Sequence, residues 1–338
     1  MNSKLLLWGN LVFGVAVLAY VLRSYGAQAL AVLKMDISPG FVVLFAVSTL
    51  ATILCLSWRW GYILTGLNNV LPVGLLNLTL YRSAAHSVAV LVPSGKLGGD
   101  PLRVWLASRK GIPTADLIAS TVVDRTLEIG SSAPFSILFA VLLLQFGVPR
   151  LEQALVTVVV GTVALAIGVA MALRRLNSGA GLVSALVRRI GADRWSIVDS
   201  SMNVIEDAEG AAATLAGQRR RMLFSFAIGL LANLLVIAEF ALLLHAFGLP
   251  ANGIAVVAAI FATGASHMFP VPAGVGVLEG AQMWLFELLG HSPEVGLAVG
   301  LAVRLRELLW MAPGLIYLLV IRVSRSSEVG NPVRPSAR

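Results

Sequence analysis

Six apolar runs constrain the fold of this 338-residue chain more than any other feature. They cover roughly residues 4–22, 40–57, 115–146, 151–173, 222–248 and 294–322. Each is long enough to cross the roughly 30 Å of hydrocarbon in a bilayer as a helix. Since 58% of the residues are hydrophobic and only 12% are charged, the sequence predicts an all-α polytopic membrane protein.

Two further apolar runs, 74–92 and 252–271, each end at a cluster of proline and glycine. Shorter amphipathic segments, 97–110 and 275–290, follow these clusters. Proline stops a helix, and glycine permits a tight reversal of the chain. We therefore predict two re-entrant helical hairpins beside about six full spans.

The two proline and glycine clusters belong to an internal repeat with a constant offset of 179 residues. Over residues 87–134, 12 of 48 positions are identical to those 179 residues later. The matched pairs include Pro93 with Pro272, Gly95 with Gly274, Asp100 with Glu279, Trp105 with Trp284, Arg125 with Arg304, and Glu128 with Glu307. Apolar composition alone does not reproduce helix breakers and charged pairs, so we interpret the repeat as a duplication.

The distribution of lysine and arginine predicts the orientation of the spans. If the N-terminus is cytoplasmic and both hairpins are re-entrant, most positive residues outside the spans, Arg59 and Arg103 among them, lie on the cytoplasmic side. This bias is the one that the positive-inside rule requires. Because three full spans separate the hairpins, the two repeat units, about 4–146 and 151–322, are expected to be inverted.

Residues 1–323 are then expected to form one transmembrane domain of the cell's inner membrane, with both termini cytoplasmic. The second unit carries an insertion, residues 174–221, in which arginines mix with acidic residues. We predict that it is a cytoplasmic amphipathic element that contacts anionic lipid headgroups, although a role in binding a partner stays open. Residues 324–338 are expected to be a disordered basic tail.

The candidate functional residues lie at the hairpin tips and on the spans that follow them. They are Pro93, Gly95, Gly98, Gly99, Asp100, Arg103, Arg125 and Glu128 in the first unit, and Pro272, Gly274, Gly276, Glu279, Arg304 and Glu307 in the second. The free amides at the start of a returning helix suit a lipid phosphate. Asp100 precedes Pro101, and Glu279 stands at the matched helix start, so we expect each of them either to cap its helix or to bind a cation or a proton.

Arg125 with Glu128, and Arg304 with Glu307, lie one helical turn apart on the long spans. An arginine at the bilayer centre costs about 2.5–3.5 kcal/mol, so each needs a buried or wet site. Either each pair neutralises itself and fixes its span to the hairpin, or the arginines contact an anionic headgroup. Three further charges have no repeat partner and are interpreted as unpaired: Asp124, Glu239 and Arg306.

Catalytic chemistry has little support in the sequence. No metal-ligand spacing, nucleophile elbow or phosphate loop is present, and the four histidines are scattered. We therefore expect no cofactor, no metal and no enzymatic activity. The net charge of +8 is explained by loops beside spans, so no nucleic-acid partner is expected. Formation of a homo-oligomer stays open.

The motifs resemble a known family of bacterial and archaeal membrane proteins. The runs LVPSG at 91–95, GGD at 98–100 with Arg103, VVDR at 122–125 and PAGVGVLEG at 272–280 are similar to the lysylphosphatidylglycerol synthase transmembrane-region family, also called flippase-like. That family includes the lipid-translocating half of the multiple peptide resistance factor and hopanoid-associated membrane proteins. The resemblance covers about residues 5–322 and implies a protein that translocates or otherwise handles lipid.

The sequence also departs from the family pattern. Ser94 replaces the glycine often found after the first motif proline, which affects the expected geometry of that tip. We expect no soluble aminoacyl-transferase domain within these 338 residues, so the resemblance does not imply synthase activity.

The leading hypothesis is a translocase that moves a phospholipid or lipid-linked headgroup across the membrane by alternating access. One alternative is an integral membrane enzyme or accessory protein of aminoacyl-lipid, hopanoid or lipid-linked glycan metabolism. The other is a scaffold that recruits a partner through residues 174–221.

Overall fold

The structure is a computed structural model that describes most of the chain. The described residues are 18–33, 37–68, 73–91, 98–145, 152–177, 181, 183–189, 202–267, 269 and 271–329. Within them, all regular secondary structure is helical. Most of the first predicted span and the tip residues Pro93 and Gly95 lie outside the described residues.

The first half of the chain contains one partly described helical segment and four fully bounded helices. Residues 18–33 are helical, so this helix continues past the predicted end of the first span at residue 22. The bounded helices are α2 (Pro39–Asn68), α3 (Leu75–Leu91), α4 (Asp100–Ser108) and α5 (Thr114–Gln145).

The second half follows a similar order with additional short helices. Its elements are α6 (Glu152–Asn177), α7 (Val183–Arg189), α9 (Met202–Gly217), α10 (Arg219–Ala246), α11 (Gly253–Ser266), the 3-10 turn η2 (Pro272–Gly274), α12 (Val277–Leu288) and α13 (Pro293–Val329). Helix α13 therefore continues into the segment that was expected to be a disordered tail.

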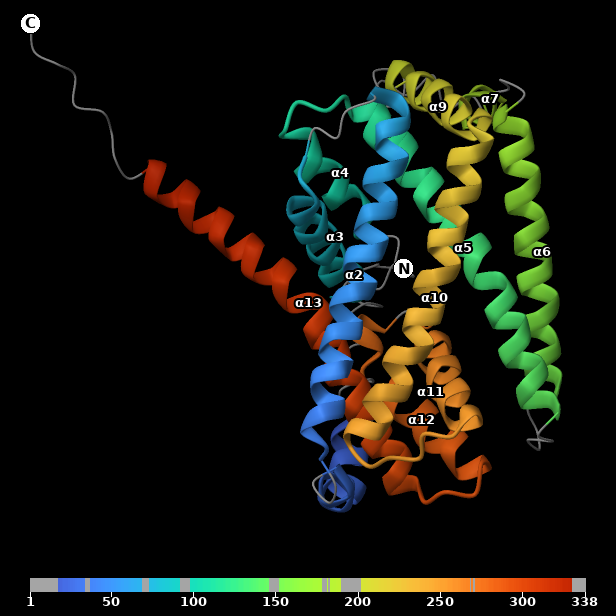
Figure 1. Ribbon diagram of the computed structural model, residues 1–338, viewed down its shortest axis with the longest axis vertical. Coiled ribbons are helices and arrows are strands. Elements are labelled where there is room, and N and C mark those ends of the chain that lie inside the picture. The colour runs from blue at the N-terminus through green and yellow to red at the C-terminus, as the bar shows by residue number, and fades with distance from the viewer. Residues whose placement is uncertain are drawn as a thin grey trace, which may run out of the picture.

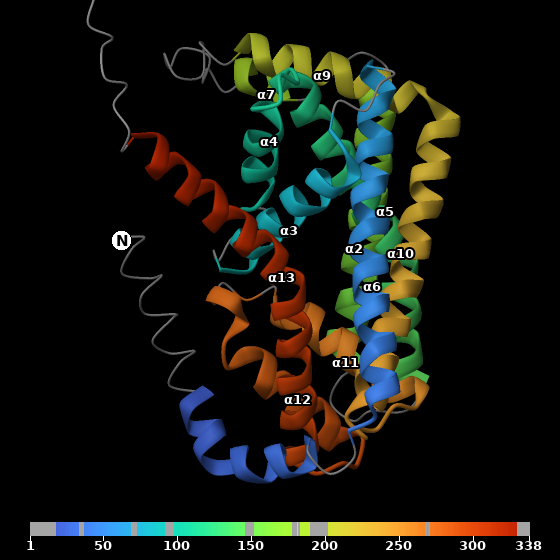
Figure 2. The same cartoon turned by 60° about the vertical axis from the view of Figure 1, so that its left-hand side comes forward.

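The long helices define the axis of the molecule (Figure 1). Helices α2, α6 and α10 run along it, and α9 lies across one end (Figure 2). The α3–α4 hairpin occupies the half of the molecule nearer α9, and the α11–α12 hairpin occupies the opposite half (Figures 1 and 2).

Three described helices are long and apolar enough to cross a membrane. They are Pro39–Leu67, Thr114–Gln145 and Arg219–Ala246, and large apolar side chains such as Leu223 and Leu234 are exposed on their surfaces. Exposed apolar helix surfaces of this length indicate contact with lipid. The helical membrane class predicted from the sequence is therefore confirmed.

Positions matched by the repeat have the same backbone conformation. Gly111 ends the turn after α4 with a φ of 80°, and its match Gly290 ends the turn after α12 with a φ of 85°. Glycine adopts this left-handed conformation without the strain that a side chain would add. Likewise, Pro134 and its match Pro313 both lie inside the long helices α5 and α13.

The proline inside α13 allows a side chain of α3 to enter the helix. Because Pro313 disturbs the local hydrogen-bond ladder, the Ser83 hydroxyl donates to the Trp310 carbonyl (2.6 Å) and accepts from the Gly314 amide (2.9 Å). A β-carbon at Gly314 would overlap the backbone of Ser83 and Ala84. Helix α13 is thus fixed against the first hairpin, although it belongs to the second half of the chain.

Replacing Gly314 with alanine tests this close crossing. Because the added methyl group meets backbone atoms, we expect Gly314→Ala to destabilise the protein by about 1–3 kcal/mol. Gly161, inside α6, has open space beyond its α-carbon, so Gly161→Ala should leave stability unchanged or raise it slightly. Thermal unfolding in detergent measures both variants, and equal midpoints would contradict the proposed packing.

Candidate functional site

Arg125 on α5 joins the first hairpin to the span that follows it. Its Nε and Nη2 atoms donate to the two carboxylate oxygens of Asp100 at 3.2 and 3.0 Å. Its Nη1 atom donates to Glu128, one turn further along α5, at 3.0 Å. A guanidinium that binds one carboxylate through two parallel bonds fixes its orientation as well as its distance.

Arg304 on α13 repeats this arrangement in the second hairpin. Its Nε and Nη2 donate to the two oxygens of Glu279 at 2.7 and 3.1 Å, and its Nη1 donates to Glu307 at 2.8 Å. The same three arginine atoms therefore bind the matched carboxylates in both halves. Of the two alternatives that the sequence leaves open, the structure shows the pairing of each arginine with the glutamate one turn away.

The tip of the second hairpin has additional contacts, because Arg304 also binds the backbone of the tip. The guanidinium donates to the carbonyls of Ala273 (2.5 Å) and Gly274 (3.0 Å), and both residues have left-handed φ angles. Glu279 in turn accepts from the Gly276 amide at 2.9 Å, so it caps α12 while it binds Arg304. Pro272 starts the 3-10 turn of this tip.

Asp100 does not cap its helix, which corrects one of the two roles expected for it. The N-cap position is Gly99, which makes no side-chain capping bond, and Asp100 is the first helical residue. Its carboxylate pairs with Arg125 and Arg103 instead. Gly99, which follows Gly98, lies directly against α3, because a β-carbon there would meet the Ala85 carbonyl.

Asp124 gathers three buried arginines from three different helices. Its carboxylate lies 2.8 Å from Arg59 of α2, 3.0 Å from Arg82 of α3 and 2.9 Å from Arg103 of α4. The expectation that Asp124 is unpaired is therefore wrong. Arg59 and Arg103, which were assigned to the cytoplasmic side, are only 0% and 2% exposed within the helices.

The sequence hides this cluster because its members are distant along the chain. Arg59 follows an apolar run and stands between Trp58 and Trp60, a pattern typical of a membrane interface. Its partner Asp124 lies 65 residues away. The one available signal is that the apolar sequence resumes at residues 61–67, so that α2 extends to Asn68.

The two halves differ at the positions matched to Arg103 and Asp124. Gln282 stands where the repeat has Arg103, and Val303 stands where it has Asp124. The Gln282 amide is buried and donates to the Ala259 carbonyl at 2.9 Å. The charged residues Arg103 and Asp124 of the first half thus correspond to the neutral residues Gln282 and Val303 of the second. The buried arginines are therefore more numerous in the first half.

Glu239 and Arg306, also interpreted as unpaired, form a buried group with each other. The Glu239 carboxylate accepts from Arg306 (2.8 Å), from the Thr49 hydroxyl (2.7 Å) and from the Trp310 indole (3.1 Å). The earlier interpretation is wrong because the partners come from helices far apart in sequence. A carboxylate that is buried among apolar helices requires partners of this kind.

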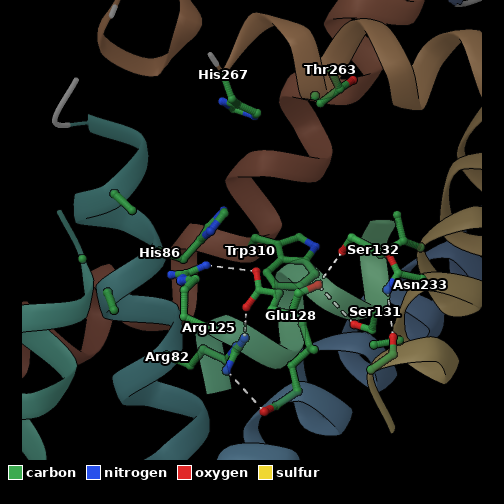
Figure 3. Close-up of a pocket in the computed structure, with 18 of the residues that line it drawn as sticks. Arg82, His86, Arg125, Glu128, Ser131, Ser132, Asn233, Thr263, His267 and Trp310 are labelled. Atoms are coloured by element: carbon green, nitrogen blue, oxygen red, sulfur yellow. Dashed lines mark hydrogen bonds and ion pairs between the residues drawn. The ribbon is translucent and has the colours of Figure 1, made fainter. Parts of the chain in front are cut away.

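A cavity of about 280 Å³ lies where these groups meet. Its lining includes Gly99 and Asp100 from the first hairpin, Thr263 and His267 from the second, and charged groups of α5 and α13. Figure 3 shows Arg82, Arg125 and Glu128 on one side, with His267 and Thr263 across from them. Both hairpins therefore border one central, polar space.

Arg59 and Arg306 both border this cavity and each has a buried guanidinium nitrogen without a partner among the described residues, and Arg59 belongs to the arginine-rich first half. In Arg59 this atom is Nη1, and in Arg306 it is Nε. An unpaired guanidinium nitrogen in a buried site favours an incoming oxyanion. Metal binding has no such support, since the described residues contain no cluster of three histidine, cysteine or carboxylate side chains.

Apolar spanning helices combined with two helical hairpins and a buried charged cavity define a polytopic α-helical membrane protein. Residues 7–314 match the family model described as lysylphosphatidylglycerol synthase TM region. The match covers most of the chain, so the protein belongs to this family and is related to flippase-like proteins of lipid metabolism. The predicted family is confirmed. A comparison with curated proteins found no match.

Removing the charge of Asp124 tests its role as the shared partner of three arginines. Because three buried guanidinium groups lose their common carboxylate, we expect Asp124→Asn to lower stability by about 3–5 kcal/mol. Adding Arg103→Gln should restore part of that loss, since it removes one uncompensated charge. Additive losses in thermal unfolding would show that the two side chains are not coupled.

The two hairpin carboxylates should differ in importance. Glu279 is 1% exposed and binds both Arg304 and a backbone amide, so we expect Glu279→Gln to cost about 3 kcal/mol. Asp100 is more exposed and caps no helix, so Asp100→Asn should cost about 1–2 kcal/mol. The reverse order in detergent unfolding would contradict this assignment.

Proposed function

We propose that the protein translocates a phospholipid or lipid-linked headgroup across the membrane by alternating access. The observation that carries the proposal is the charged central cavity, which is bordered by both hairpins. In secondary transporters, broken helices meet near the membrane midplane, and their polar backbone is tolerated because it borders a cavity. Membership of a family with flippase-like members supports the same function.

The proposed orientation has the two repeat units inverted in the membrane. The α3–α4 and α11–α12 hairpins occupy opposite halves of the molecule, which supports this arrangement (Figure 1). Helix α9 and the arginine-rich segments beside it then lie at the cytoplasmic face of the inner membrane, where they contact anionic headgroups. Both termini are cytoplasmic in this proposal.

The arginines have two different tasks in the proposed mechanism. Arg125 and Arg304 are engaged with hairpin carboxylates, so they hold the hairpins in position. Arg59 and Arg82 border the cavity beside each other, and Arg59 has a nitrogen there without a partner among the described residues, so in this proposal they receive the phosphate group. Acyl chains remain in the surrounding bilayer, because only the headgroup must be shielded from hydrocarbon.

Filling the cavity tests the proposed function without removing a charge. Gly264 borders the cavity and an added β-carbon there meets no other atom, so we choose phenylalanine at this position to occupy the proposed headgroup site. We expect Gly264→Phe to slow translocation by about tenfold or more, the loss produced by about 1.4 kcal/mol of added barrier. The assay follows fluorescent phospholipids in proteoliposomes as a membrane-impermeant quencher reaches them.

Gly161→Phe is the matched control. This glycine also lies inside a helix with open space beyond it, but it is not part of the cavity lining. The control should translocate lipid at the unmodified rate. Unmodified protein that moves no lipid faster than empty vesicles, across neutral and anionic phospholipids, would contradict the proposed function.

A further inference from the structure

His267 and Glu307 form a pair at the second hairpin's side of the cavity. The His267 Nε2 atom lies 3.1 Å from a Glu307 carboxylate oxygen, and the two side chains are 11% and 7% exposed. Both residues border the cavity (Figure 3 shows His267). A histidine joined to a carboxylate in a membrane interior is a group that can take up and release a proton near neutral pH.

Glu128, which the repeat matches to Glu307, has different partners in the first half of the chain. Glu128 lies 3.0 Å from Arg125, 3.0 Å from Arg82 and 3.6 Å from Arg59. Three permanently charged arginines surround this carboxylate. Glu307 instead has one arginine and one histidine, and Val88 occupies the position matched to His267. Proton uptake is therefore confined to the second member of the matched pair.

The ion pairs that the described residues form around the cavity balance in charge. They join six arginines to six carboxylates: Arg59, Arg82, Arg103, Arg125, Arg304 and Arg306 with Asp100, Asp124, Glu128, Glu239, Glu279 and Glu307. With neutral histidines these charges sum to zero. A headgroup with one negative charge would leave the site with an excess charge, which is costly where the dielectric constant is low.

The other titratable groups near His267 are held by partners of their own. On α12, Glu279 binds Arg304, and on α10, Glu239 binds Arg306. On α3, His86 borders the same cavity and packs near the Trp310 ring, with ring centroids 5.3 Å apart. His267 is a cavity histidine that lies within 3.1 Å of a carboxylate oxygen, that of Glu307.

We propose that His267 and Glu307 form a proton-binding site, and that the cavity takes up a singly anionic headgroup together with one proton. This proposal rests on the proposed function. It adds that the substrate headgroup carries one negative charge and that the coupled ion is a proton. The imidazole, whose Nε2 atom lies beside Glu307, takes up the incoming proton and becomes an imidazolium that the carboxylate stabilises. Glu307 stays ionised, and the same proton returns to water when the headgroup leaves.

Lipid binding at different pH values tests this coupling without requiring transport. The purified protein in detergent is titrated with phosphatidylglycerol between about pH 6 and pH 8, the range in which imidazoles titrate. Uptake of one proton with the lipid makes the affinity rise as the pH falls, by up to about tenfold per pH unit. Phosphatidylcholine, which carries no net charge, should show no such dependence.

Two histidine variants separate proton binding from structure. His267→Gln keeps a donor for Glu307 but binds no proton, so its affinity for phosphatidylglycerol should not change with pH. His245→Gln is the control, because His245 contacts the Ala241 carbonyl on its own helix and does not border the cavity. It should keep the pH dependence of the unmodified protein.

The outcomes distinguish the two proposals. A pH-independent affinity in the unmodified protein, a pH dependence retained by His267→Gln, or no binding of phosphatidylglycerol would overturn the proton site. Translocation without pH-linked binding leaves the proposed function in place and removes the coupling. Binding that depends on His267 and pH, in a protein that moves no lipid, supports the proton site and removes the proposed function.

Discussion

The burial of charge in an apolar bundle is the constraint on which this structure depends. Asp124 satisfies it in the first half by bringing arginines of α2, α3 and α4 to one carboxylate of α5. Each of these arginines would cost much free energy in hydrocarbon without a partner. The helices that carry them must therefore meet at the Asp124 carboxylate. The network thereby fixes the first hairpin against two long helices and gives the cavity its polar wall.

The two halves share one arginine–carboxylate contact and differ in the residues around it. Each long helix binds its hairpin through an arginine that contacts one carboxylate on the hairpin and one on its own next turn. Near this shared contact, the first half has Arg103 and Asp124, whereas the second has Gln282 and Val303 at the matched positions. The first half is therefore richer in arginine, and the second half places His267 beside Glu307.

The sequence predicts what depends on local pattern and on the repeat. Apolar run length identifies the membrane class, and the matched prolines and glycines locate the hairpins, the second of which reverses through left-handed backbone at its tip. Contacts between distant segments are not encoded locally, so the partners of Asp124 and Glu239 were missed. Arg59 was misplaced for the same reason, since its burial depends on a carboxylate of another helix.

A cryo-electron microscopy structure of the protein in nanodiscs that contain phosphatidylglycerol tests the central claim most directly. We predict density for a lipid phosphate in the cavity, within hydrogen-bonding distance of Arg59 or Arg82. We also predict that the α3–α4 and α11–α12 hairpins reach the cavity from opposite faces of the bilayer. Lipid density confined to the outer surface of the bundle, or two hairpins on the same face, would contradict the account.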